Sequence, residues 1–231
     1  KDLRIEVTGT AIEIDHPQLR WDNFLEAFRS FGSGGAKADV SVVVPRSIAL
    51  TLGVVSASAL ISGLNTDAKL NTVSGDIIVD GLTGDLDVNA VSGDVQVRGL
   101  LGSLNAHSVS GDIAATGTMH RADADTVSGN VLFDSEGPIS RININTVSGN
   151  STVRIDAGYP ADFVVRSVSG KVIIDGARIS GTGTTNYTGS IGELSGQFVD
   201  VRVNSVSGDL AVLRREAAGG VAGQNDSSSE S

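Results

Sequence analysis

Apolar and polar positions alternate along most of the chain in a repeating unit of nine residues. Counted from Val73 as position 0, apolar side chains occupy positions 0, 4 and 6, and the scheme starts again at Leu82. Positions 4 to 6 read apolar, mostly polar, apolar, which is the two-residue period of a strand with one buried face. Positions 1 to 3 read Ser-Gly-Asp or a close variant, and these residues favour tight turns. Each unit therefore predicts one short strand and one turn.

A Val-Ser-Gly tripeptide marks a longer period of two such units. It begins at Val73, Val91, Val109, Val127, Val147, Val168 and Val206, and a degenerate copy begins at Val55. The first four copies are 18 residues apart, and a fixed period of this length is typical of stacked repeats. We therefore expect an all-β, two-faced, stacked β-solenoid with 18-residue coils made of nine-residue half-repeats. In this hypothesis the same aliphatic columns, with Val73, Val91 and Val109 in one of them, are buried on two opposing walls.

The pattern changes on either side of the repeats. Residues 3–14 alternate as two strands, and residues 40–44 read as another strand that ends at Pro45. The predicted domains are therefore residues 1–54, with N-terminal strands and an amphipathic helix at about 18–31 that form a cap leading into the solenoid, and residues 55–213, the β-solenoid repeats with a loop insertion near 180–196. Residues 214–231 are rich in Ala, Gly, Ser and acidic residues, and we expect a disordered tail.

Aromatic residues gather in the predicted helix at helical spacing. A helix that covers an open strand edge of the solenoid explains them, because unpaired edges must be protected. The alternative is a docking helix for a partner, with a second aromatic contact in the loop at 180–189. On that interpretation the contact candidates are Trp21, Phe24, Phe28, Phe31 and Tyr187.

Composition narrows the possible functions. Hydrophobic residues make up 40% of the chain but aromatic residues only 4%, so the core must be aliphatic. The net charge of −10 disfavours nucleic acid as a partner, because phosphates would be repelled. The absence of cysteine excludes disulfides, thiolate metal sites and a cysteine nucleophile. No apolar run reaches the roughly 20 residues of a membrane-spanning helix.

Carboxylates occupy equivalent turn positions in consecutive coils. Asp76, Asp94 and Asp112 are expected to stack as one column, which Asn130, Asn150 and Lys171 continue. A structural role, with the side chains bonded to turn amides, is one interpretation. The alternative is calcium, which favours clustered carboxylate oxygens. The change from Asp to Asn and Lys along the column weakens the calcium hypothesis, and we expect no other cofactor.

The stretch Val-Ser-Gly-Asp-Ile-x-Val-x-Gly-Leu at residues 73–82, with its repeats down the chain, resembles a bacterial adhesin family of β-strand repeats, a domain of unknown function. The resemblance covers about residues 40–213, and the sequence departs from its pattern at residues 119–121. It implies a stacked β fold in bacteria, often encoded with envelope-associated proteins, and it brings no catalytic residues. No signal peptide is visible, and residues before Lys1 could hold an export signal or an anchor. The compartment is therefore left open between envelope-associated and cytoplasmic.

The dense repeat without a reactive constellation leads to a functional hypothesis. We expect a non-enzymatic structural or interaction module of adhesin-like type, with a protein or cell-surface partner or self-association. A calcium-stabilised binding module that uses the stacked turn carboxylates is the alternative.

Overall fold

The computed structural model describes residues 4–8, 11–15, 40–179, 184–194 and 196–215. The chain divides into two compact units, residues 1–43 and residues 44–231. In the first unit, β1 (Arg4–Thr8) and β2 (Ala11–Asp15) form an antiparallel two-stranded sheet, which confirms the two strands predicted there. The predicted helix at about 18–31 and its aromatic residues lie outside the described residues.

The second unit is a β-solenoid, as predicted, and its described residues include no helix. Its strands are β3 (Leu50–Ser56), β4 (Ala59–Leu64), β5 (Ala68–Ser74), β6 (Ile77–Thr83), β7 (Leu86–Ser92), β8 (Val95–Ser110), β9 (Ile113–Ser128), β10 (Val131–Ser135), β11 (Arg141–Ser148), β12 (Ser151–Asp156), β13 (Ala161–Ser169), β14 (Val172–Ile174), β15 (Ala177–Arg178), β16 (Thr185–Ile191), β17 (Val199–Ser207) and β18 (Leu210–Arg215). Residues 40–44 form no strand, so the strand predicted there is wrong. Val40 and Val43 are exposed, because no described strand pairs with this segment.

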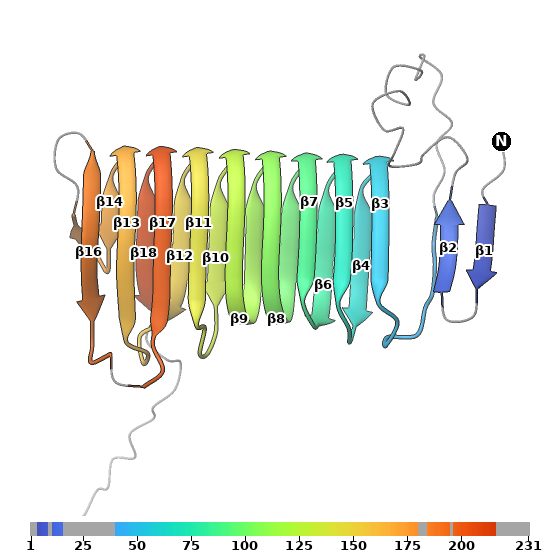
Figure 1. Cartoon of the computed structure of the whole chain (residues 1–231), viewed down its shortest axis with the longest axis horizontal. Helices are drawn as coiled ribbons and strands as arrows, with labels where there is room; N and C mark the ends of the chain where they lie inside the picture. Colours follow the sequence, from blue (N-terminus) through green and yellow to red (C-terminus); the bar gives the residue numbers. More distant parts are fainter. Residues whose placement is uncertain (1–3, 9–10, 16–39, 180–183, 195, 216–231) are drawn as a thin grey trace, which may run out of the picture. The chain divides into compact units, whose positions relative to one another are not determined.

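The strands form two opposing faces, and Figure 1 shows the strands of each face side by side in a row. The first face contains β3, β5, β7, β11, β17, β13, β16 and the C-terminal parts of β8 and β9; the second contains β4, β6, β10, β12, β18, β14, β15 and the N-terminal parts of β8 and β9. Coils from β3 to β9 pair in parallel, so that Leu52 lies beside Leu70 and Leu70 beside Val88, an interval of 18 residues at each step. This register confirms the predicted coil length.

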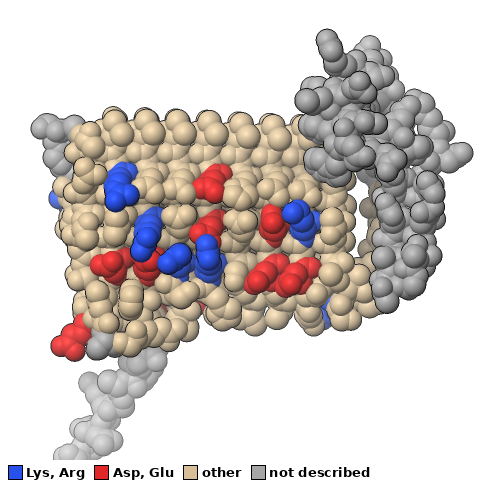
Figure 2. All heavy atoms as spheres, viewed as in Figure 1, with Lys and Arg blue, Asp and Glu red and all other residues tan. Residues whose placement is uncertain are grey.

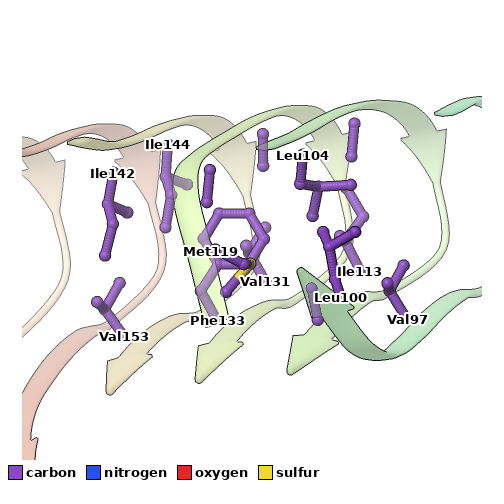
Figure 3. Packing of buried hydrophobic residues seen from close by; sticks show 14 of the residues in the cluster. Val97, Leu100, Leu104, Ile113, Met119, Val131, Phe133, Ile142, Ile144 and Val153 are labelled. Atoms are coloured by element: carbon purple, nitrogen blue, oxygen red, sulfur yellow. The ribbon is translucent and has the colours of Figure 1, made fainter. Parts of the chain in front are cut away.

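Aliphatic side chains from both faces fill the space between them. The columns at positions 4, 6, 9, 13 and 15 of the repeat are buried as predicted, and their members in the first full repeat are no more than 1% exposed: Ile77, Val79, Leu82, Leu86 and Val88. Figure 3 shows the same layer further along, where Ile142 and Ile144 of β11 lie in one layer with Val153 of β12.

The core changes where the sequence departs from the repeat at residues 119–121. Gly102 of β8 pairs with Met119 of β9, but Ser103 pairs with Arg121, so His120 is an extra residue that forms a bulge. Met119 is fully buried beside Phe133 (Figure 3). The solenoid therefore absorbs the irregular residues by a local shift of register and a larger side chain in the core.

The valine that opens each repeat differs from the prediction. Val73 is buried, but Val91 and Val109 are 46% and 50% exposed. In β7 every second residue up to Ala90 points inward, so the alternation places the next residue, the valine, on the outside. The valines still stack, because the residues on either side of them pair in register. Their burial in a core column is therefore the part of the hypothesis that is wrong.

The glycine of each turn lies against the glycine of the preceding coil. Gly111 has a φ of +125°, which side-chain-bearing residues rarely adopt, and a Cβ atom on it would lie 2.1 Å from the carbonyl oxygen of Gly93. Gly93 has the same relation to Gly75, at 2.3 Å. Neighbouring turns are therefore stacked backbone on backbone, and only glycine fits between them.

The last coil in the sequence is not the last coil in space. β17 lies between β11 and β13, and β18 lies between β12 and β14 (Figure 1). The columns remain aligned, because Val203 pairs with Ile144 on one side and with Val165 on the other. Residues 199–215 therefore form a coil that is inserted between two coils that follow each other directly in the chain.

Antiparallel strands close the end of the solenoid beyond this inserted coil. β16 pairs with the outer edge of β13, and β15 pairs with that of β14. Part of the predicted loop insertion at 180–196 is therefore a strand. Because β16 covers the outer edge of β13, the following strand β17 can pair with β13 only on its inner side.

The stacked glycines predict a strong asymmetry between turn positions. Gly111→Ala should lower the free energy of unfolding by roughly 3 kcal/mol or more, because the substitution adds backbone strain and a clash with main-chain atoms that cannot move aside alone. Gly158→Ala is the matched control, since a Cβ atom there meets nothing within 4 Å, and it should change the stability by less than about 0.5 kcal/mol. Urea unfolding followed by circular dichroism measures both values, and equal effects at the two sites would contradict the stacking.

Candidate interaction surfaces

A ladder of side-chain oxygens follows the turn edge of the solenoid. The Oδ1 atom of each ladder residue accepts a hydrogen bond from the main-chain N–H of the equivalent residue in the next coil. The N···Oδ1 distances are 3.0 Å from Asp94 to Asp76, 2.9 Å from Asp112 to Asp94, 2.7 Å from Asn130 to Asp112, 3.0 Å from Asn150 to Asn130, 2.9 Å from Asp209 to Asn150 and 2.8 Å from Lys171 to Asp209. The carboxylates predicted to stack therefore do so, and each bonds a turn amide.

The ladder also explains the residue types along the column. Asp and Asn are interchangeable in it, because both offer an Oδ1 acceptor. Lys171 is the last member in space, so no described coil beyond it requires an acceptor from its side chain. Asp209 stands between Asn150 and Lys171, and sequence reasoning missed it because the inserted coil comes last in the chain.

The weak metal candidates Asp76, Asp94 and Asp112 lie in this ladder, one per coil. In the part of the chain that the structure describes, no three His, Cys, Asp or Glu side chains come close enough together to hold a metal ion. One oxygen of each carboxylate is already engaged by a main-chain N–H. The second oxygens remain directed to solvent-exposed positions along the edge, except that Asn130 Nδ2 donates to Asp112 Oδ2 at 3.3 Å.

A second polar ladder crosses the outside of the first face. Asn89 Nδ2 donates to Asn71 Oδ1 at 3.1 Å, and His107 Nδ1 lies 3.0 Å from Asp125 Oδ2. Further along, Asn145 Nδ2 donates to Asp125 Oδ1 at 2.7 Å and Asn204 Nδ2 donates to Asn145 Oδ1 at 2.8 Å. These contacts connect side chains in neighbouring coils and stabilise the register of this face.

Opposite charges on the first face are paired. Figure 2 shows Lys, Arg and acidic side chains intermingled over the middle and lower part of this face, whereas its upper margin carries none. Lys69 Nζ lies 3.7 Å from Asp87, and Arg121 bonds Asp123. Hydrogen bonding to Asp123 raises the pKa of Arg121 above its ordinary value. Exposed pairs of this kind contribute little to stability.

Charge pairing also occurs around the inserted coil. On the first face, hydrogen bonding to Asp200 raises the pKa of Arg202. On the second face, Arg215 donates to Asp134 at 2.8 Å and to Asp156 at 3.1 Å, and the bond to Asp156 raises its pKa while burial opposes the shift. These contacts join the last strand, β18, to β10 and β12.

An open groove follows the lower part of the first face. Its walls carry several charged side chains, namely Asp67, Lys69, Asp85, Asp87, Arg121 and Asp123. Asp85 N donates to Asp67 Oδ1 at 2.8 Å and Ser103 N donates to Asp85 Oδ1 at 3.0 Å, so the turn carboxylates of this edge have the same structural role as those of the other edge. The groove is thus a product of coil stacking with its charges largely committed to neighbours.

An apolar row runs along the uncharged upper margin of the first face. It contains the opening valine of successive coils, each between 46% and 54% exposed, in the spatial order Val91, Val109, Val127, Val147, Val206 and Val168. We refer to these six residues as the valine row. An exposed serine follows each of these valines in the chain. Contiguous exposed apolar side chains are typical of interaction surfaces.

Tyr187 is the only partner-contact candidate of the sequence among the described residues. It belongs to β16, is half-buried, and packs against the hydrophobic core. Its ring lies over Gly189, where a Cβ atom would be 2.3 Å from the hydroxyl oxygen of Tyr187. Its position explains the aromatic residue as a cover for an edge glycine. The other candidates, Trp21, Phe24, Phe28 and Phe31, lie outside the described residues.

The fold and its surfaces define a class of protein, the two-faced β-solenoid repeat domains. The model of the Toastrack DUF4097 family matches residues 2–213, and the chain belongs to this family, which is a domain of unknown function. No curated protein and no solved structure matches the chain. Among the described residues, no helix has the length and apolar character needed to cross a membrane.

The oxygen ladder predicts which substitutions the turn edge tolerates. Asp94→Ala removes the acceptor for the N–H of Asp112 and should lower the free energy of unfolding by about 1 kcal/mol. Asp94→Asn keeps an Oδ1 acceptor and should retain most of that stability. Thermal unfolding of both variants decides the point. A larger loss for Asn than for Ala would mean that negative charge, and not the hydrogen bond, maintains this edge.

Proposed function

We propose that the protein is a non-enzymatic structural or interaction module of adhesin-like, envelope-associated type. The valine row carries this proposal, because its six exposed apolar side chains are arranged in a line on an uncharged margin. Stacking gives every coil an equivalent contact point, so a partner that binds along the row makes the same contact repeatedly. Multiple weak contacts of this kind add up to substantial avidity.

The absence of enzymatic activity is part of the proposal. The ionisable side chains that the repeat places in columns already have structural partners. Asp94 and Asp112 bond turn amides, and His107 is paired with Asp125. Side chains committed in this way support a role for the surface in contact formation.

The valine row predicts a specific loss of binding. The triple variant Val109→Ser, Val127→Ser and Val147→Ser removes half of the row without touching the buried columns. Wild-type protein should sediment with isolated bacterial envelopes, and the triple variant should bind at least tenfold more weakly, because the apolar contacts of three adjacent coils are gone.

The matched control changes the polar ladder on the same face: Asn89→Ser, Asn145→Ser and Asn204→Ser. This variant should bind as the wild type does, and both triple variants should unfold cooperatively. Equal envelope binding by wild type and the valine variant would contradict the proposal that the row is the contact surface.

Calcium binding is a second candidate function, favoured by the regular file of Asp76, Asp94 and Asp112 along one edge. If calcium stabilises this edge, 5 mM calcium should raise the melting temperature relative to excess chelator, and Asp76→Asn with Asp112→Asn should abolish the difference. An unchanged melting transition in calcium and in chelator would remove the calcium hypothesis and leave the ladder a purely structural device.

A further inference from the structure

The inserted coil, residues 199–215, occupies a slot between two coils that are continuous in the chain. β11 and β12 form one wall of this slot, and β13 and β14 form the other. We propose that this slot is also a binding site for a second copy of this chain, whose β17 and β18 fill it in place of the protomer's own. The proposal concerns an exchange of coils between copies and does not depend on the proposed function of the valine row.

Main-chain hydrogen bonds hold the inserted coil on both sides. Gly149 N donates to Ser207 O at 3.1 Å, and Gly208 N donates to Ser169 O at 3.1 Å. Leu210 N donates to Lys171 O at 2.8 Å. All of these bonds join residues 199–215 to the slot walls. They would form identically if the coil came from another copy of the chain, which is the condition for a domain swap.

The slot requires an occupant with the repeat pattern. Its walls present Ile144 and Phe163, which are fully buried, and the coil covers them with Val201 and Val203, which are also fully buried. Polar partners are matched as well, since Asn204 Nδ2 donates to Asn145 Oδ1 at 2.8 Å. A second copy of this chain supplies the same side chains in the same register.

The connection to the inserted coil permits the exchange. Residues 192–198 join β16 to β17, and of these Leu194 and Phe198 are 41% and 38% exposed. The coil is therefore tied to the rest of the solenoid by a connection with exposed side chains rather than by a buried one. Folding in dilute solution favours the protomer's own coil, because its effective concentration at the slot is high. Folding at high protein concentration favours exchange.

Engineered cysteines test the exchange, because the chain has no cysteine of its own. One full-length variant carries Asn145→Cys in the slot wall, and another carries Asn204→Cys in the coil. The two are unfolded together, refolded at about 100 μM under oxidising conditions, and analysed by mass spectrometry for disulfide-linked heterodimers. The control pair is Asn71→Cys with Asn89→Cys, which are also register neighbours with an amide contact, of 3.1 Å, but lie in successive coils.

Exchange predicts at least tenfold more heterodimer from the Asn145 and Asn204 pair than from the control pair, and no such excess when the variants are mixed after folding. Equal yields from both pairs would overturn the proposal. So would a lack of heterodimer when the double variant Asn145→Cys/Asn204→Cys closes its disulfide within one chain. If either cysteine prevents folding, the pair Ser148→Cys and Ser207→Cys, with Ser74→Cys and Ser92→Cys as control, gives the same comparison at exposed register positions.

Discussion

The close approach of main chain to main chain at the turns is the constraint on which this structure depends. From one coil to the next, the carbonyl oxygen of a turn glycine lies where a Cβ atom of the following turn glycine would be, as Gly93 and Gly111 illustrate. A side chain there would separate the coils and break the parallel hydrogen bonds on both faces at once. The positive φ of these glycines adds a second reason for the residue type.

This stacking turns every position of the repeat into a row along the solenoid. The inward rows form the aliphatic core, and the turn row of Asp and Asn side chains caps the N–H groups of the next coil. The outward row of valines has no such internal partner among the described residues, and this difference makes it the surface with the strongest claim to an external contact. One geometric fact, the repetition of equivalent residues at a constant spacing, thus supplies both the stability of the fold and its candidate function.

The sequence predicted the coil length, the strand positions and most core columns, because a buried face and a two-residue period leave a direct pattern in the chain. The valine row was misjudged for a physical reason. Its inward neighbours, such as Ser108 and Thr126, are small and polar, so the hydrophobic pattern marked the valine as the buried residue. The narrow inner side of the turn favours small side chains, whatever their polarity.

The position of the inserted coil was beyond the reach of sequence reasoning. Residues 199–215 carry the same pattern as every other coil, so they fit between β11 and β13 as well as beyond β13. The deciding factor is β16, which pairs with one edge of β13 and leaves only the other edge for β17. Of the candidate site, the Asp ladder was predicted by its spacing, but Asp209 was not, because its place in the ladder follows from the insertion. Tyr187 was predicted as a partner contact from residue type alone, and its burial depends on tertiary packing.

The most direct test of this account is the pattern of nuclear Overhauser effects between main-chain amide protons in isotope-labelled protein. Stacked coils predict cross-peaks between the turn residues of neighbouring coils, 18 residues apart in the first half of the solenoid. In the second half they predict contacts of the amides around Ser207 with those around both Ser148 and Ser169. Contacts between the regions of Ser148 and Ser169 without Ser207 between them would contradict the inserted coil, and turn contacts at any other interval would contradict the solenoid itself.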